Sequence, residues 1–346
     1  IERERFVDLL MIGCSAAARI PFNALERRLF DRQLNNEMSG KPPVFILGHW
    51  RSGTTHLYNI LSKSPRFGYL PPIATGIPWN MLTLGRWLEP LLLKILPSER
   101  FIDNVPVMPD SPQEDEIALA NMTKPSFYHG LYFPSRFDEH FNRGVYFRGC
   151  APLEVENWKQ TFQYFMRKLS ILQSGRPILV KNPVYTARVS LLQSMYPEAK
   201  FIHIHRNPYR VFESMTNFYS NLFHELAFQN YDHLSIPDIV LEHYPRIMDR
   251  LISDTEHMRS HQFIELGYDE LDQRPLSVLR QIYKGLDLGA FEEDEDIFTK
   301  YLDSVKQYQK NPYSHNSETI EKVNRHWGKY VDHWGYEVPG KQQGAT

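Results

Sequence analysis

The sequence is poor in cysteine and has no long uninterrupted apolar run. Its 346 residues include only Cys14 and Cys150, too few for a disulfide framework or a zinc site, so we expect a reducing, cytoplasmic environment. No stretch reaches the roughly 18 to 20 apolar residues of a membrane-spanning helix. The chain begins with Ile1 rather than Met, so we expect an incomplete N-terminus and leave an upstream signal or anchor open.

Two shorter apolar segments are present, "FVDLLMIGCSAAA" at Phe6–Ala18 and "WLEPLLLKIL" at Trp87–Leu96. Both contain charged residues, and short apolar runs are usually buried. We therefore expect two helices that pack on the core. Peripheral contact with a membrane surface, or contact with a lipid-like substrate, is the alternative.

A strong net charge is also missing. The 39 Lys and Arg residues and the 41 Asp and Glu residues leave a formal net charge of −2, which argues against nucleic acid as the main partner. Any anion-binding site must therefore be local. The chain is rich in aromatic residues, with 19 Tyr, 21 Phe and 6 Trp, a composition that suits a thick core and also an apolar substrate groove.

Short apolar strands alternate with helical patterns along much of the chain. A strand at Val44–Leu47 precedes a helix at 53–63, and later strands end at Lys181, at Arg206 and near Leu266. This alternation predicts an α/β fold with a P-loop-like, mostly parallel sheet flanked by helices on both faces. Ligands of such sheets bind at the carboxyl ends of the strands.

The loop after the first strand reads "GHWRSGTT" at 48–55. Its glycine spacing matches a nucleotide phosphate loop, but threonine stands where that motif has lysine. Backbone N–H groups and a helix N-terminus would still bind an anion. Arg51 supplies a positive charge, and the hydroxyl donors and the second glycine of the loop are Ser52, Gly53, Thr54 and Thr55.

No metal site is predicted beside this loop. A magnesium-dependent kinase needs a carboxylate after an apolar strand, whereas the candidate strands end in Lys181 and in His205-Arg206. His203 and His205 share one face of a strand, but no third ligand has suitable spacing. A sulfuryl group carries less charge than a phosphoryl group, so amides, hydroxyls and one or two cations suffice to bind it. Sulfuryl transfer therefore fits best.

A second anion motif follows the strand "KFIHIH". Arg206 stands at the strand end, where its guanidinium can make a two-pronged contact to a phosphate. Pro208 suits the first position of a helix, and Ser214 lies further along the same helix.

With these two motifs, the chain resembles the sulfotransferase superfamily over roughly residues 43–290. Arg51–Thr55 resembles the 5′-phosphosulfate loop, and Arg206 with Ser214 resembles the 3′-phosphate motif. The resemblance implies the co-substrate 3′-phosphoadenosine 5′-phosphosulfate (PAPS). It also implies that Tyr268, which opens "YDEL", lies near the adenine.

The loop arginine is similar to that of tyrosylprotein and many bacterial sulfotransferases, and "LVKNP" resembles the lysine-bearing strand end of the tyrosylprotein enzymes. The resemblance implies that Lys181 lies on the transferring sulfonate. We expect Arg51 and Lys181 to stabilise the developing charge. The glutamate that those enzymes carry about twenty residues after the loop arginine is absent, since Pro71–Leu82 holds no acidic residue. Glu114 is our candidate base, with Glu116 and His129 as alternatives.

Two of the candidate bases, Glu114 and Glu116, lie in the segment "DSPQEDEIALANM" at 110–122. The same residues are typical of a helix start, with Asp110 or Ser111 as cap and acidic residues in the first turn. The aromatic segment His326–Tyr336 is expected to form a closing helix, or to cover the co-substrate.

We predict one sulfotransferase domain over 1–346. Residues 3–36 are expected to form two helices broken near Pro21, and a further helix is expected at Glu154–Gln173. The predicted parts are N-terminal helices (1–42), the 5′-phosphosulfate loop unit (43–63), a long irregular acceptor-side insertion (64–150), the core with the 3′-phosphate motif (151–290), and C-terminal helices with a tail (291–346).

The predicted function is transfer of a sulfonate group from PAPS to the hydroxyl of a small or lipid-like acceptor. Strongly anionic sugar chains are disfavoured because Lys and Arg do not cluster in 64–150. Two alternatives stay open: a nucleotide-dependent kinase with a degenerate phosphate loop, and a binding module that keeps the fold without turnover.

Overall fold

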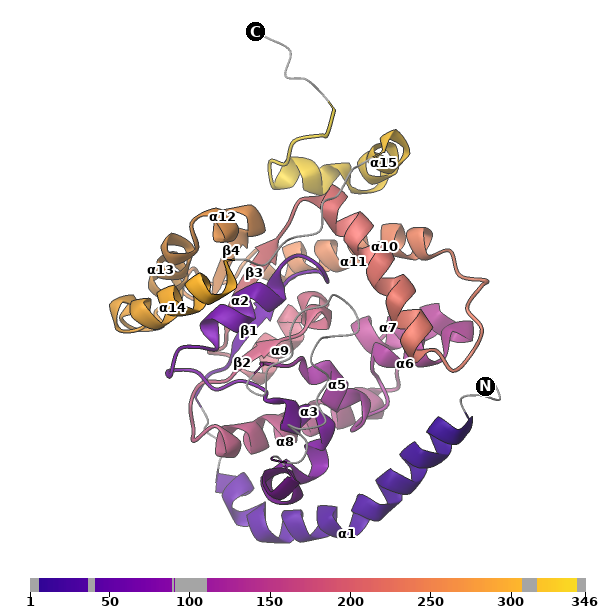
Figure 1. Cartoon of the computed structure of the whole chain (residues 1–346), viewed down its shortest axis with the longest axis vertical. Coiled ribbons are helices and arrows are strands. Elements are labelled where there is room, and N and C mark those ends of the chain that lie inside the picture. The colour runs from indigo at the N-terminus through magenta and orange to yellow at the C-terminus, as the bar shows by residue number, and fades with distance from the viewer. Residues whose placement is uncertain (1–5, 37–40, 89, 91–110, 307–315, 341–346) are drawn as a thin grey trace.

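A parallel sheet of four strands lies at the centre of the molecule (Figure 1). The computed structural model describes residues 6–36, 41–88, 90, 111–306 and 316–340. The strands are β1 (Val44–Leu47), β2 (Leu179–Lys181), β3 (Lys200–His205) and β4 (Phe263–Gly267), in the order β2-β1-β3-β4. All three pairings are parallel, so the predicted α/β fold is confirmed. The strand that follows β1 in the chain, β2, lies on one side of β1, and the next, β3, lies on the other. Parallel sheets bind ligands where the strand order reverses in this way, here next to β1.

Each face of the sheet is covered by helices because the strands are apolar on both sides. Val44 and Ile46 of β1 belong to one apolar cluster, and Phe45 and Leu47, which alternate with them, belong to the other. The first cluster is completed by α2 (Thr54–Leu61), α12 (Tyr268–Gln273), α13 (Pro275–Leu286) and α14 (Glu295–Val305). The second is completed by α8 (Pro152–Leu172), α9 (Val189–Met195), α10 (Pro208–Leu226), α11 (Ile236–Thr255) and α15 (Ser317–His333).

The segment predicted to be a long irregular insertion, 64–150, consists of a succession of short helices separated by loops where it is described. Proline begins or precedes several of them, and proline suits a first helical turn but stops longer helices. They are α3 (Pro72–Gly76), η3 (Pro78–Asn80), the π-helical turn η4 (Met81–Gly85), α5 (Asp115–Ala120), α6 (Tyr128–Tyr132), η5 (Pro134–Arg136) and α7 (Phe137–Tyr146). Two further short helices elsewhere are η6 (Pro183–Ala187) and η7 (Phe291–Glu293).

Two helix boundaries also differ from the sequence prediction. The N-terminal residues form one helix, α1 (Phe6–Asn36), which continues through Pro21. Helix α5 begins at Asp115 with Glu114 at its N-cap, so Ser111 is not its cap, and Asp110 lies outside the described residues. Proline and an acidic turn set a preference for a helix start, and packing decides where it falls.

The prediction that Phe6–Ala18 packs on the core was wrong. Phe6, Leu10 and Met11 are 65%, 60% and 59% exposed. Trp87 is 79% exposed, and most of the second apolar segment lies outside the described residues. None of the helices in the described ranges is long and apolar enough to cross a membrane.

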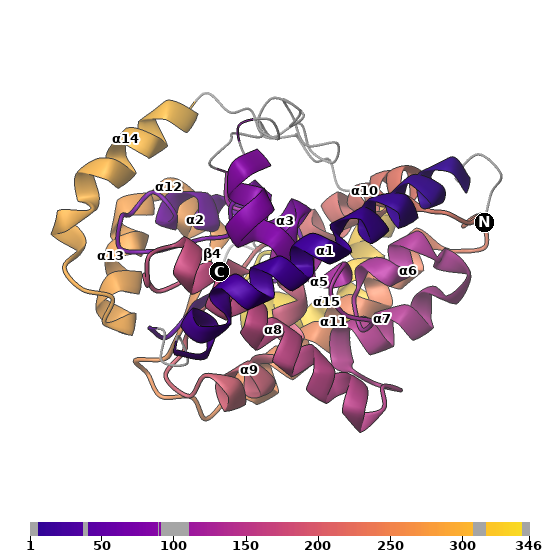
Figure 2. The ribbon, with the colours of Figure 1, turned by 90° about the horizontal axis from the view of Figure 1, so that it is seen from below.

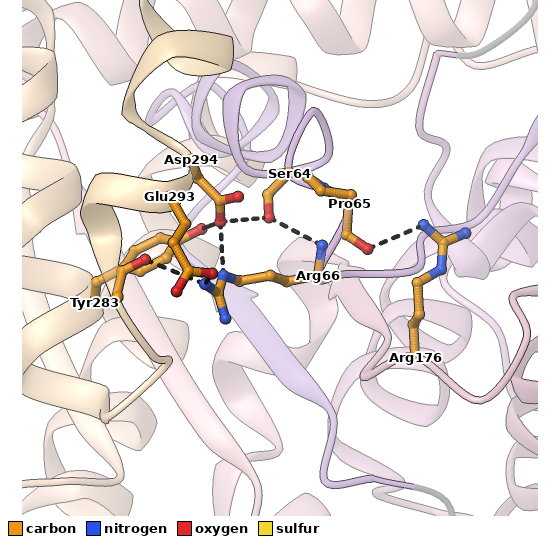
Figure 3. A network of polar contacts seen from close by, with 8 residues as sticks. Ser64, Pro65, Arg66, Arg176, Tyr283, Glu293 and Asp294 are labelled. Atoms are coloured by element: carbon orange, nitrogen blue, oxygen red, sulfur yellow. Dashed lines mark hydrogen bonds and ion pairs between the residues drawn. The ribbon is translucent and has the colours of Figure 1, made fainter.

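One buried carboxylate joins the C-terminal helices to the segment after α2 (Figure 3). Asp294 is 2% exposed, and its Oδ2 accepts hydrogen bonds from Ser64 Oγ (2.7 Å), Arg66 Nε (3.0 Å) and Tyr283 Oη (2.7 Å). Arg66 also pairs with the exposed Glu293. Because the carboxylate is buried, its three donors replace the water that it loses on folding.

The substitution Asp294→Ala tests this junction. It leaves the buried Ser64 and Tyr283 hydroxyls and the partly buried Arg66 guanidinium without this acceptor, so we expect the free energy of unfolding to fall by about 3 kcal/mol. Urea denaturation followed by circular dichroism measures the loss. The control Asp296→Ala removes an exposed acidic residue two positions on, and its effect should stay within about 0.5 kcal/mol. Equal effects of the two substitutions would contradict the assigned role of Asp294.

Candidate active site

The loop between β1 and α2 has a conformation that its sequence makes accessible. Gly53 has φ +99°, and a Cβ there would lie 2.1 Å from Cδ2 of Tyr268, so both the backbone and the close neighbour require glycine. Arg51 also has a positive φ, 70°, which costs a non-glycine residue free energy unless its surroundings hold it. The loop therefore holds a backbone conformation that a simple strand-to-helix connection does not need.

The two anion motifs meet at Arg51. Arg51 Nε donates to Ser214 Oγ at 2.8 Å, and Arg206 Nη1 donates to the Arg51 carbonyl at 3.1 Å. The Arg51 guanidinium also lies 5.6 Å from the Phe218 ring centre. Ser214 and Phe218 are on α10, while Arg206 follows β3, so the structure brings together the predicted residues of two strand ends.

Tyr268 lies at the same edge of the sheet, directly after β4. The Arg206 guanidinium carbon is 4.5 Å from its ring centre, and Gly53 packs on the ring. The ring is largely buried, with 8% of the residue exposed. Its predicted contact with an adenine stays a prediction.

Hydroxyl and amide donors gather around the loop. The first backbone bond of α2 runs from His56 N–H to the Gly53 carbonyl (3.0 Å), so the N–H groups of Thr54 and Thr55 precede the helical bonds. Thr186 fixes the start of the loop, since its Oγ1 accepts from Gly48 N–H (2.9 Å) and donates to the Gly48 carbonyl (3.1 Å). Nothing in the sequence pattern indicated this role of Thr186.

Two buried polar atoms of the site have no hydrogen-bond partner among the described residues. They are Ser52 Oγ, in a residue that is 2% exposed, and Arg206 Nε. An unsatisfied buried donor typically lowers stability by about 1 to 3 kcal/mol. Such a group therefore needs an explanation, and a bound ion is one. Both atoms belong to the motifs that the sequence assigned to an anion.

Lys181 and Glu114 meet beside the loop. Lys181 ends β2, its Nζ donates to Thr55 Oγ1 at 3.2 Å, and it forms an ion pair with the Glu114 carboxylate. The Lys181 side chain is 3% exposed and that of Glu114 is 18% exposed. The carboxylate is therefore accessible from one side while its partner cation is enclosed.

The other two candidate bases have different surroundings. Glu116 is buried, and its carboxylate accepts from Ser126 Oγ (2.7 Å) and from Phe127 N–H (3.0 Å), as a structural carboxylate does. The His129 ring lies 6.3 Å from that of His140 on α7. Of the three candidates, Glu114 is the one for which the structure provides a contact with Lys181.

Asn182 positions the first turn of α5 next to this pair. Its Nδ2 donates to Asp115 Oδ1 and to Glu116 Oε2, both at 3.0 Å, and its Oδ1 accepts from Val184 N–H. Burial raises the pKa of Asp115 to about 8, and the charges of Glu116 and Glu114 add to this, while hydrogen bonds from Tyr185 and Asn182 oppose it. The acidic residues of this turn are thus a buried network.

The paired histidines of β3 have other partners than a metal. His203 Nδ1 lies 2.7 Å from Glu265 Oε2, and His205 Nδ1 lies 2.8 Å from Tyr336 Oη. The His205 ring also stacks on Trp334, with centres 4.9 Å apart. The segment after α15 therefore packs on the end of β3, next to the strand end that carries Arg206. Whether it covers a co-substrate stays a prediction.

Solved structures share this fold. The sulfotransferase STF9 from Mycobacterium avium superposes with a TM-score of 0.68 at 20% identity, covering 92% of this chain and 85% of that one. The sulfotransferase STF1 from Mycobacterium tuberculosis superposes with a TM-score of 0.62 at 16% identity, covering 89% and 81%. At these identities the likeness extends to the fold alone.

Relatives by sequence carry the likeness further. The chain is 30% identical over 315 residues to the omega-hydroxy-beta-dihydromenaquinone-9 sulfotransferase Stf3 of Mycobacterium bovis, covering 90% of this chain and 80% of that protein. The Mycobacterium tuberculosis protein of the same name matches equally. Residues 42–293 match the model of the sulfotransferase family. Because this match spans most of the chain and includes both anion motifs and Lys181, the chain belongs to the sulfotransferase family.

Proposed function

We propose that the protein transfers the sulfonate group of PAPS to a hydroxyl of a lipid-like acceptor. The observation that carries the proposal is the double link between the strand ends, from Arg206 to the Arg51 carbonyl and from Arg51 to Ser214. These links bring the donors of two anion motifs to one edge of the sheet. A nucleotide with phosphates at both its 3′ and 5′ positions needs two such donor sets close together.

The residues present fit such a nucleotide. Ser52 Oγ and Arg206 Nε are buried donors without a hydrogen-bond partner among the described residues, and Arg51, Thr54 and Thr55 add cationic and neutral donors beside them. In the proposal Arg206 and Ser214 hold the 3′-phosphate, and Tyr268 lies near the adenine. The 5′-phosphosulfate is held by Arg51, Ser52, Gly53, Thr54 and Thr55.

The roles in transfer follow from the contacts of Lys181. When bound, PAPS supplies a sulfonate on a phosphate leaving group. Glu114 accepts the proton of the acceptor hydroxyl as the new oxygen–sulfur bond forms. Lys181, held by Thr55, and Arg51 stabilise the negative charge that develops on the bridging oxygen as the old bond breaks. Asn182 keeps the α5 turn in place so that Glu114 stays beside Lys181.

The acceptor class is proposed from a relative. The name of the mycobacterial relatives specifies an omega-hydroxylated menaquinone derivative, which is a lipid-like alcohol. We propose an acceptor of the same kind, a hydroxyl on a long apolar chain. The cytoplasmic location is proposed on the same basis as before, the low cysteine content.

Transfer of labelled sulfonate tests the proposed function directly. The protein is incubated with labelled PAPS and a panel of hydroxylated prenyl quinones and long-chain alcohols, and the extracted lipid is counted. Label in the lipid extract, dependent on protein, supports the proposal. Binding of 3′-phosphoadenosine 5′-phosphate (PAP) without transfer to any member would instead favour the binding module.

The substitution Arg206→Ala tests the 3′-phosphate site. It removes a charged donor and also the support of the Arg51 carbonyl, so we expect PAP to bind at least about tenfold more weakly, as measured by calorimetry. The control Arg210→Ala removes an exposed arginine of α10 and should change affinity less than about twofold. Unchanged PAP affinity in the Arg206 variant would contradict the assignment.

The substitution Glu114→Gln tests the base. It keeps the shape of the side chain but cannot accept the proton, so we expect kcat to fall by about 10² to 10⁴ while PAP affinity stays within about threefold. His129→Ala serves as the comparison and should keep most of its turnover. If instead Glu114→Gln turned over normally and His129→Ala did not, the base would be His129.

A further inference from the structure

The large apolar side chains in the N-terminal half of α1 are not covered by any of the described residues. They are well exposed, Phe6 at 65%, Val7 at 59%, Leu10 at 60%, Met11 at 59% and Ile12 at 54%. Figure 1 shows α1 along the lower edge of the molecule with its N-terminal end at the periphery, and Figure 2 shows the same helix from below. Soluble surfaces seldom carry so large an apolar area without a function.

The exposure is not confined to one side of the helix. At 100° per residue, Phe6, Leu10, Val7 and Met11 cover less than half of the circumference, and Ile12 and Ile20, which is 63% exposed, point to the rest. A second protein surface would cover one side of such a helix and leave the other in water. A lipid phase surrounds it completely.

The C-terminal half of the same helix is firmly held, so the exposed half is not a helix that has failed to dock. Glu26 and Lys168 are both fully buried and form an ion pair at 2.5 Å. Glu26 Oε2 also accepts from the N–H groups of Leu82 (3.1 Å) and Thr83 (2.8 Å) of η4. A buried pair with satisfied hydrogen bonds defines one position of the helix on η4.

Positive charge follows the apolar half along the helix. From residue 19 to residue 32, Arg27, Arg28 and Arg32 are exposed and Arg19 is partly exposed, against one exposed acid, Asp31. Lipid phosphates lie just outside the apolar layer, at the level where these arginines begin if the apolar half is inserted. Trp87, 79% exposed, stands two residues after the end of η4 and has the amphipathic ring that favours this interface.

We propose that residues 6–25 of α1 dock the protein on the surface of an anionic lipid bilayer. At about 1.5 Å per residue, the apolar stretch Phe6–Ala18 is about 20 Å long, short of the roughly 30 Å of a hydrocarbon core. It is therefore too short to cross the bilayer and enters it from one side, while the arginines stay at the level of the phosphates.

The same block of structure carries the candidate base. Helix α3 packs on η4 and on α5, the N–H of Gln113 donates to the Leu70 carbonyl (2.9 Å), and Glu114 follows Gln113. These contacts form a continuous connection from the docking helix to the turn that carries the candidate base. This use of the docking, collection of a lipid acceptor from the bilayer, rests on the proposed function.

Vesicle co-sedimentation tests the docking. The full chain is mixed with vesicles of phosphatidylcholine and phosphatidylglycerol at 3:1, and with vesicles of phosphatidylcholine alone. We expect the protein to sediment with the anionic vesicles and at least about tenfold less with the neutral ones. The double variant Leu10→Glu/Met11→Glu should lose at least tenfold of its binding to anionic vesicles, with an unchanged circular dichroism spectrum.

The matched control is Leu153→Glu/Ile297→Glu, which places two glutamates at exposed apolar positions of α8 and α14. Its binding should stay within about twofold of the unmodified protein. Docking through α1 is overturned if the unmodified protein stays in the supernatant with anionic vesicles, or if the α1 variant binds as tightly as the control. It is also overturned if light scattering shows that the unmodified protein is a dimer that does not bind vesicles, and that the α1 variant is a monomer.

Failure of the docking is distinguishable from failure of the proposed function. Neither Leu10 nor Met11 contributes to the site, so the α1 variant should bind PAP normally and should sulfonate a water-soluble short-chain alcohol as the unmodified protein does. Its rate on an acceptor embedded in anionic vesicles should fall by about tenfold. Normal vesicle binding without sulfonate transfer to any acceptor would support the docking and contradict the proposed function.

Discussion

The contact between Arg206 and the backbone of Arg51 is the interaction on which the proposed site depends. It joins the loop after β1 to the end of β3, and the Arg51 side chain completes the joint by its hydrogen bond to Ser214 on α10. Parallel pairing of β1 with β3 makes this possible because it brings their carboxyl ends to one edge. The strained φ of Arg51 is held from two directions, which is how a loop keeps a shape that its own residues do not favour.

A second interaction, the ion pair of Lys181 with Glu114, lies on the other side of β1. Lys181 ends β2, the other neighbour of β1, and pairs with Glu114. Glu114 stands at the N-cap of α5, whose next residues are buried carboxylates held by Asn182. Burying a carboxylate costs free energy. Here the hydrogen bonds that compensate for it also fix the turn that holds the partly exposed Glu114 beside Lys181. The proposed site thus combines one strand edge assigned to anion binding with one helix turn that carries the proposed base.

Much of this arrangement could be predicted from the sequence because it depends on local patterns. Strand ends, the glycine-rich loop and Pro208 at the start of α10 have short-range signatures, and parallel topology then places their polar residues together. The buried network of Asp115, Asn182 and Tyr185 could not be predicted, since it joins segments that are distant in sequence. The same limit explains the error at Phe6–Ala18: apolar composition indicates burial, and only the packing shows that the described part of the chain leaves this half of α1 exposed.

The measurement that tests the central claim most directly is a crystal structure of the protein with bound PAP. The account predicts the 3′-phosphate in contact with Arg206, near Ser214, and the 5′-phosphate at the N–H groups and hydroxyls of the loop that contains Arg51. Both phosphates should lie on one side of the joint between the two strand ends. A PAP molecule bound elsewhere, or one that contacts only one of the two strand ends, would contradict the account.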